Sequence, residues 1–311
     1  MSRLAILAAL PLLIATSARA GTLGAPVVGG ELVPPGKWAD AVAILGPDGS
    51  CTGTLVAPDV VLTAGHCAGI HATEVVANTT NYNGSGGQRI AIKSFTTYPD
   101  YQHTFDVAVI VLAKAVTGVT PRAVAKACTY AGFADETMVH LVGFGLTQND
   151  GGGSNTTLHE VMAPVLDAGC TGGNGCRAGA SPAGEFVAGG NGGDSCFGDS
   201  GGPVYLDTPR GAVLIASVSR GLDDAATPCG GGGVYVRTDK VLSWLEETTG
   251  KTIAQDSCTG DGEIESSGPT GNGGGADRAA LNSGCSTSGG SAGALVFLAV
   301  IGSLRLRRRT R

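Results

Sequence analysis

Residues 194–203, Asp-Ser-Cys-Phe-Gly-Asp-Ser-Gly-Gly-Pro, decide how the rest of the chain is interpreted. Ser200 lies between Gly-Asp and Gly-Gly-Pro, which indicates a nucleophile on a tight, exposed turn. Glycines allow backbone conformations that are closed to other residues, and they let backbone N–H groups approach a substrate oxygen. A serine hydroxyl alone is a weak nucleophile, so this stretch requires a base and a group that orients the base.

A histidine and a carboxylate in suitable settings lie upstream. His66 is part of the stretch Leu-Thr-Ala-Gly-His-Cys at 62–67, and Asp106 opens the apolar run 106–112. The alternative for Asp106 is a turn residue at the start of a strand, and Asp100 is a competing carboxylate nearby. We expect the other histidines to be structural or solvated: His71, His103, His140 and His159.

These three motifs, in the order His, Asp, Ser, resemble the trypsin/chymotrypsin family of serine proteases, since unrelated folds place the same residues in other orders. Val27-Val28-Gly29-Gly30 is similar to the mature N-terminus of that family, so the resemblance runs from Val27 to about Gly250. It implies an all-β fold of two antiparallel six-stranded β-barrels, chymotrypsin-like, with a C-terminal helix. It also implies a monomeric serine endopeptidase for protein or peptide substrates, with no cofactor. The loop between His66 and Arg89 lacks the cluster of acids that binds calcium in trypsin, so we expect no metal.

Short β-rich runs between turn residues agree with that architecture. We expect strands near 42–45, 52–56, 60–63, 89–97, 106–112, 139–146 and 158–166. We expect the closing helix at 238–247, with Gly250 as its stop.

The resemblance also assigns roles. His66 would be the general base, Asp106 the group that orients it, and Ser200 the nucleophile. The backbone N–H groups of Gly198 and Ser200 would form the oxyanion hole.

Asp194, six residues before Ser200, matches the carboxylate at the floor of the trypsin specificity pocket, which selects Arg or Lys. The alternative is a loop aspartate without a ligand. Ser219 and Gly221 would lie on the substrate-binding edge strand, and Gly221 and Gly233 would keep the pocket mouth open. Arg220 departs from the family, which usually has Trp there, so we expect weaker apolar contacts and acidic residues in the substrate.

Activation should depend on a new amino terminus. In the resembled family the first residue of the Val-Val-Gly-Gly motif, here Val27, folds inward and pairs with the aspartate before the nucleophile, here Asp199. Residues 21–26 would then be a short pro-segment of a zymogen. Pro26 precedes Val27 where the family usually has Arg or Lys, so self-activation is not expected, and another protease or a different trimming route is needed.

Composition narrows the classes of protein. Seven of the 20 basic residues lie at the two ends of the chain, which leaves 13 basic against 26 acidic residues. A nucleic-acid binder needs a basic face, so we expect no nucleic-acid partner. Nine cysteines indicate an oxidising compartment, but the odd number leaves one without a partner.

The family resemblance implies the disulfides Cys51–Cys67 and Cys196–Cys229. We expect local pairing of Cys170 with Cys176, with metal-ligand spacing as the alternative. Cys128 could pair with Cys258 and connect the two barrels. Cys285 is then the cysteine without a disulfide partner.

The two ends indicate export. Residues 1–20 are typical of a signal peptide that directs secretion across the inner membrane. Residues 251–284 indicate a Gly/Ser-rich linker. Residues 285–311 combine Cys285, an apolar segment and an Arg cluster, and resemble the MYXO-CTERM sorting tail of myxobacterial surface proteins. That resemblance implies a transmembrane helix in the tail, membrane attachment through it and processing at Cys285. The protein would then be surface-anchored or extracellular. The alternative is a degenerate tail anchor with an incidental thiol.

A rival function is a non-catalytic protease homologue that binds a partner at the cell surface. Such homologues typically lose a triad member or the oxyanion glycine. His66, Asp106, Ser200 and Gly198 are all present, which favours the enzyme.

Overall fold

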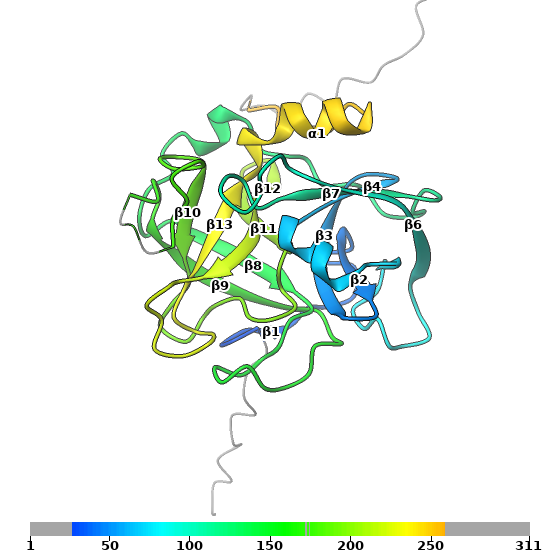
Figure 1. Ribbon diagram of the computed structural model, residues 1–311, viewed down its shortest axis with the longest axis horizontal. Coiled ribbons are helices and arrows are strands. Elements are labelled where there is room, and N and C mark those ends of the chain that lie inside the picture. The colour runs from blue at the N-terminus through cyan, green and yellow to red at the C-terminus, as the bar shows by residue number, and fades with distance from the viewer. Residues whose placement is uncertain (1–26, 172, 174, 259–311) are drawn as a thin grey trace, which may run out of the picture. The chain divides into compact units, whose positions relative to one another are not determined.

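The computed structural model describes residues 27–171, 173 and 175–258, and the strands of this region form two barrels (Figure 1). The first barrel is closed in the order β2-β3-β4-β7-β6-β5, and all of its neighbouring strands are antiparallel. Its strands are β2 (Ala41–Gly46), β3 (Gly49–Ala57), β4 (Val60–Thr63), β5 (Glu74–Ala77), β6 (Gln88–Thr97) and β7 (Ala108–Leu112). Aliphatic side chains such as Ile44, Leu55 and Ile110 fill its interior.

The second barrel follows the order β9-β10-β13-β12-β11-β8 and closes through antiparallel pairing of β8 with β9. Its strands are β8 (Met138–Gly143), β9 (His159–Asp167), β10 (Glu185–Ala188), β11 (Pro203–Thr208), β12 (Gly211–Gly221) and β13 (Gly233–Arg237). The short strand β1 (Glu31–Leu32) pairs with β9 outside this ring. Leu141, Phe186 and Tyr235 pack in its core. The prediction of two six-stranded antiparallel barrels is confirmed.

The closing helix α1 (Leu242–Thr249) follows a single 3-10 turn at Thr238–Lys240. It begins later than predicted: Val241 is its N-cap residue, and no side chain caps the first turn. The Thr238 hydroxyl donates to the carbonyl of Leu214 at 2.9 Å. Gly250 ends the helix as expected, in the left-handed conformation at φ 66°, and its N–H donates to the carbonyl of Glu246. Glycine adopts this conformation without steric cost.

The chain packs on the barrels beyond the helix, which corrects the boundary predicted at residue 251. Ile253 is only 1% exposed, and the N–H of Val124 donates to the carbonyl of Ala254 at 2.8 Å. Cys258 forms a disulfide with Cys128, which joins this segment to the crossover between the barrels. The first residues of the predicted linker therefore belong to the folded region. The remainder of 251–284, the tail 285–311 and residues 1–26 lie outside the described residues.

All four predicted disulfides are present: Cys51–Cys67, Cys128–Cys258, Cys170–Cys176 and Cys196–Cys229. Within the described region, no helix has the length and apolar character needed to span a membrane.

Candidate active site

Strand pairing in the first barrel brings His66 and Asp106 together. β4 and β7 are antiparallel with Thr63 opposite Ala108, so the residues after β4 and before β7 lie at the same end of the barrel. His66 occupies the 3-10 helix at 65–70 that follows β4, and Asp106 lies two residues before β7. The disulfide Cys51–Cys67 attaches this histidine turn to β3.

The Asp106 carboxylate is surrounded by donors. His66 Nδ1 lies 2.9 Å from Oδ2, the backbone N–H of His66 donates to Oδ1 at 2.9 Å, and the Ser219 hydroxyl donates to Oδ2 at 2.7 Å. Burial alone would raise the Asp106 pKa, but these hydrogen bonds and the charge of His66 outweigh it, so the pKa is lowered. A carboxylate only accepts hydrogen bonds, so Nδ1 of His66 carries a proton and Nε2 is free to accept one.

The loop that carries Ser200 is held against the first barrel by Thr52. The Thr52 backbone N–H donates to the Ser200 carbonyl at 2.9 Å, and its hydroxyl donates to the Gly198 carbonyl at 2.8 Å. Gly198 and Gly201 have φ angles of 97° and 79°, and a Cβ on Gly201 would lie 2.0 Å from Oγ1 of Thr63. Only glycine fits this turn and this close approach.

A cavity of about 420 Å³ lies beside these residues. His66, Asp106, Ser200, Ser219 and Gly221 all line it. The His66 side chain is 42% exposed, whereas Asp106 is only 1% exposed, so the imidazole faces the cavity and the carboxylate stands behind it. Phe197, which is 60% exposed, also lines the cavity and was not singled out from the sequence.

Asp194 is buried and does not line this cavity directly. Its Oδ1 accepts hydrogen bonds from the backbone N–H of Ser195 at 2.8 Å and from the hydroxyl of Tyr235 at 3.2 Å. Its Oδ2 accepts hydrogen bonds from the backbone N–H groups of Gly230 at 3.0 Å and Gly232 at 2.9 Å. Burial raises the Asp194 pKa, although these four donors oppose that effect. The neighbouring Ser195 does line the cavity.

The glycines predicted at the pocket mouth differ in their surroundings. A Cβ on Gly221 would meet nothing within 4 Å, so this position borders open space. A Cβ on Gly233 would lie 3.1–3.4 Å from Arg220, Tyr235 and Ser195, so a side chain there would crowd the region around Asp194.

Asp199 is a second buried carboxylate. Its oxygens accept N–H hydrogen bonds from Gly145 at 2.7 Å and Cys196 at 2.8 Å. Burial raises its pKa to about 7, and the nearby charge of Asp194 adds to the rise. No lysine, arginine or histidine of the described region forms an ion pair with it. Val27 is fully buried, and in the uncleaved chain its nitrogen is an amide bonded to Pro26.

The competing carboxylate and the other histidines lie outside the cavity. Asp100 is 64% exposed and pairs with His103, and exposed His71 pairs with Asp48. His140 contacts Asp207 at 3.0 Å. These positions match the structural or solvated roles expected for them.

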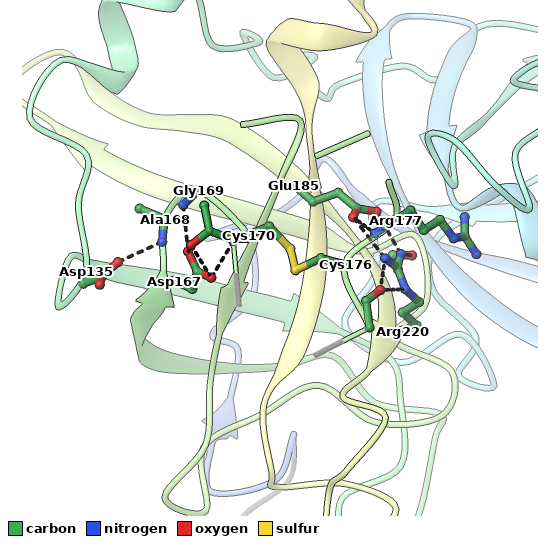
Figure 2. The surroundings of a disulfide bond; sticks show 12 residues. Asp135, Asp167, Ala168, Gly169, Cys170, Cys176, Arg177, Glu185 and Arg220 are labelled. Carbon is green, nitrogen blue, oxygen red and sulfur yellow. Dashed lines mark hydrogen bonds and ion pairs between the residues drawn. A yellow bond between two sulfur atoms is a disulfide. The ribbon is translucent and has the colours of Figure 1, made fainter. Parts of the chain in front are cut away.

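Two further residues were not predicted from the sequence, Arg177 and Glu185 (Figure 2). Glu185 is fully buried at the start of β10, and its oxygens accept hydrogen bonds from Nη1 and Nη2 of Arg220 at 2.9 and 3.0 Å. Arg220 therefore has its counter-charge inside the protein, which corrects the expectation that it faces acidic residues of the substrate. The signal available in the sequence was a glutamate followed by Phe-Val-Ala, because a charge in a buried strand needs a partner.

Arg220 lines the cavity and also contacts a residue that holds Asp106. Its Nη1 donates to Oγ of Ser219 at 2.9 Å, and the Ser219 hydroxyl donates to Asp106. A continuous set of polar contacts thus runs from Glu185 through Arg220 and Ser219 to Asp106.

Comparison with known proteins places this site in context. The model of the Trypsin family matches residues 27–245. Trypsin 5G1 of Aedes aegypti is 31% identical over 234 residues, covering 72% of this chain and 85% of that protein. Trypsin of Saccharopolyspora erythraea is 34% identical over 232 residues, covering 71% of this chain and 97% of that protein. Serine protease 56 of Homo sapiens is 31% identical over 237 residues, but these cover only 38% of its length.

Proposed function

The chain belongs to the trypsin family of serine proteases and is a serine-type endopeptidase, and on this premise we propose that it cuts peptide bonds after arginine or lysine outside the cell. The observation that carries the proposal is the hydrogen bond between His66 Nδ1 and buried Asp106, in the same cavity as Ser200.

The proposed reaction has two steps. In the first, His66 Nε2 takes the proton of Ser200 Oγ as that oxygen attacks the substrate carbonyl carbon, and His66 then gives the proton to the departing amine. In the second, water repeats the attack on the acyl-enzyme and releases the new carboxyl end. Asp106 keeps the imidazole in the required tautomer. The N–H groups of Gly198 and Ser200 bind the oxyanion, and each donor contributes about 3–4 kcal/mol in comparable enzymes.

Asp194 provides the preference for a basic residue. Its burial, raised pKa and position behind Ser195 mark it as a carboxylate that gains from an incoming cation. A guanidinium or ammonium group of the substrate would supply the missing counter-charge. Gly221 leaves room for a long side chain to pass.

Cleavage before Val27 activates the enzyme. The new α-ammonium group would pair with Asp199, which has no cationic partner in the described region of the uncleaved chain. Because Pro26 precedes Val27, a separate protease must make this cut.

The protein is exported from the cell and attached to the membrane through its C-terminal tail. Four disulfides fit a protein that works in an oxidising compartment. Residues 1–20 would direct secretion, and the tail 285–311 would hold the enzyme at the membrane until processing at Cys285.

The test uses secreted protein whose N-terminus has been sequenced and found to be Val27. Matched peptides with Arg, Phe or Ala before the cleavable bond are compared, with the Ser200→Ala variant as control. Cleavage after Arg that disappears in the variant supports the proposal. Cleavage after Phe or Ala instead overturns the role of Asp194, and no cleavage by protein with a free Val27 overturns the enzyme assignment.

A further inference from the structure

Arg177 places a guanidinium in the active-site cavity. It directly follows Cys176, which forms a disulfide with Cys170, and its side chain extends away from that disulfide (Figure 2). The side chain lines the same cavity as His66 and Ser200 and is 20% exposed.

The protein fixes the Nη1 nitrogen and the backbone of Arg177 by hydrogen bonds. Nη1 donates to the carbonyls of Tyr101 and Thr104, in the loop before Asp106, and the backbone N–H donates to Glu185 at 2.8 Å. Nε and Nη2 donate no hydrogen bond to any residue of the described region. These two N–H groups lie on one edge of the planar guanidinium, which is the edge that binds a carboxylate through two parallel hydrogen bonds.

The nearby carboxylates are already occupied. Asp106 Oδ2 lies 4.0 Å from Nη2, beyond hydrogen-bond distance, and accepts from His66 and Ser219. Both oxygens of Glu185 bind Arg220. Burial and the positive charge of Arg220 lower the Arg177 pKa despite these two anions, so its charge is only partly compensated. Arg177 would therefore gain from a further carboxylate.

The open edge of β12 indicates where a substrate would meet Arg177. Pairing with β11 ends at Ser217, while β12 continues through Ser219 to Gly221, and these last residues line the cavity. A peptide that adds to this edge as a further strand would place the residues before its cleaved bond along Ser219 to Gly221, near Arg177. This placement rests on the proposed function, which puts the cleaved Arg or Lys toward Asp194.

We propose that Arg177 is a specificity-determining residue, which selects substrates that carry aspartate or glutamate shortly before the cleaved Arg or Lys. The proposed selection depends on a direct contact between Arg177 and the substrate carboxylate, and not on the overall charge of the protein. The chain as a whole has a formal net charge of -6, so its long-range field opposes the approach of acidic peptides. A preference for acidic peptides must then come from a direct contact.

The test compares pairs of peptides that differ only in Glu against Gln. The residue is placed second, third or fourth from the bond, counting the cleaved Arg as first, and kcat/KM is measured with protein whose Val27 is free. At one position or more we expect the Glu peptide to be preferred on the order of tenfold, and 1 M salt to reduce the preference by screening.

Variants identify the residue responsible. Arg177→Gln should bring the Glu/Gln ratio to about one, and Arg177→Lys, which keeps the charge without the planar fork, should retain part of it. The matched control is Arg89→Gln, which removes an exposed arginine on β6 that pairs with Glu74, and it should leave the ratio unchanged. Because each ratio is measured within one enzyme, a general loss of activity does not affect it.

The outcomes separate this proposal from the proposed function. Cleavage after Arg with no preference for Glu at any position overturns the role of Arg177 alone. A Glu preference that survives in Arg177→Gln also overturns it, as does an equal fall in the rates of both peptides with the ratio kept. If protein with a free Val27 cleaves none of the peptides, the proposed function and this inference both fail.

Discussion

The stability of the uncleaved protein is predicted to fall as pH rises from about 4 to about 7, because Asp199 is buried and pairs with no cation of residues 27–171, 173 and 175–258. Its pKa is raised from the ordinary value of 3.8 to about 7 in the folded chain. Between these values the folded protein binds a proton that the unfolded chain releases. Raising the pH through this window therefore favours unfolding.

The magnitude follows from the size of the pKa shift. Each pKa unit is worth about 1.4 kcal/mol, so the fully ionised carboxylate costs the folded state about 4 kcal/mol at pH 7.5. Part of this cost is present at pH 4.5, because the unfolded chain is already partly ionised there. The loss expected between pH 4.5 and pH 7.5 is therefore about 3 kcal/mol.

The assay is urea unfolding of the uncleaved protein at both pH values, beside Asp199→Asn. Both proteins carry Ser200→Ala to prevent self-digestion. Asparagine keeps the shape of the side chain but does not titrate, so the difference between the two proteins isolates Asp199 from all other groups. A third sample, cleaved before Val27, should show a smaller loss at pH 7.5, because the new ammonium group supplies the counter-charge.

One result would refute this reasoning. If the uncleaved protein and Asp199→Asn change in parallel between the two pH values, Asp199 already has a counter-charge in the uncleaved chain. If cleavage before Val27 leaves the pH dependence unchanged, Val27 is not the partner of Asp199.

Three further substitutions test the site. Asp106→Asn should lower kcat by about 10⁴ with little change in KM, because the amide favours the wrong tautomer of His66; steady-state kinetics on an Arg peptide measures this, and a loss below tenfold would contradict it. Asp194→Asn should lower kcat/KM for Arg peptides by roughly a hundredfold or more, because the substrate cation loses its buried partner; an unchanged ratio of Arg to Phe cleavage would exclude the pocket role. Glu185→Gln should lower the free energy of unfolding by about 3 kcal/mol, because Arg220 loses its buried counter-charge; urea unfolding with a loss below about 1 kcal/mol would show that the pair contributes little.

The fold and the contact of His66 with Asp106 could be predicted because their signals are local. Short aliphatic strands bounded by Gly, Pro and Asp mark the barrels. His66, Asp106 and Ser200 each lie in a motif of a few residues. The choice of Asp106 over Asp100 rested on the resembled family, in which Asp-Val-Ala is followed by aliphatic residues. The structure places Asp106 against His66, while Asp100 is exposed.

The remainder depends on contacts between distant segments. Glu185 and Arg220 are 35 residues apart, and Arg177 is held at the cavity by hydrogen bonds to Tyr101 and Thr104, more than 70 residues earlier in the chain. Neither feature has a motif. The packing of 251–258 was missed for a different reason. The composition there indicates a linker, but Ile253 and the disulfide of Cys258 are enough to attach the segment.

Covalent labelling with an organophosphorus fluoridate tests the central claim most directly. Such reagents phosphorylate a serine whose hydroxyl is activated by a neighbouring base. With Val27 free, we predict one labelled residue, Ser200, identified by mass spectrometry, together with loss of cleavage after Arg and absence of label in His66→Ala. An unlabelled Ser200, or labelling that persists without His66, would contradict the assignment of His66, Asp106 and Ser200 as one catalytic unit.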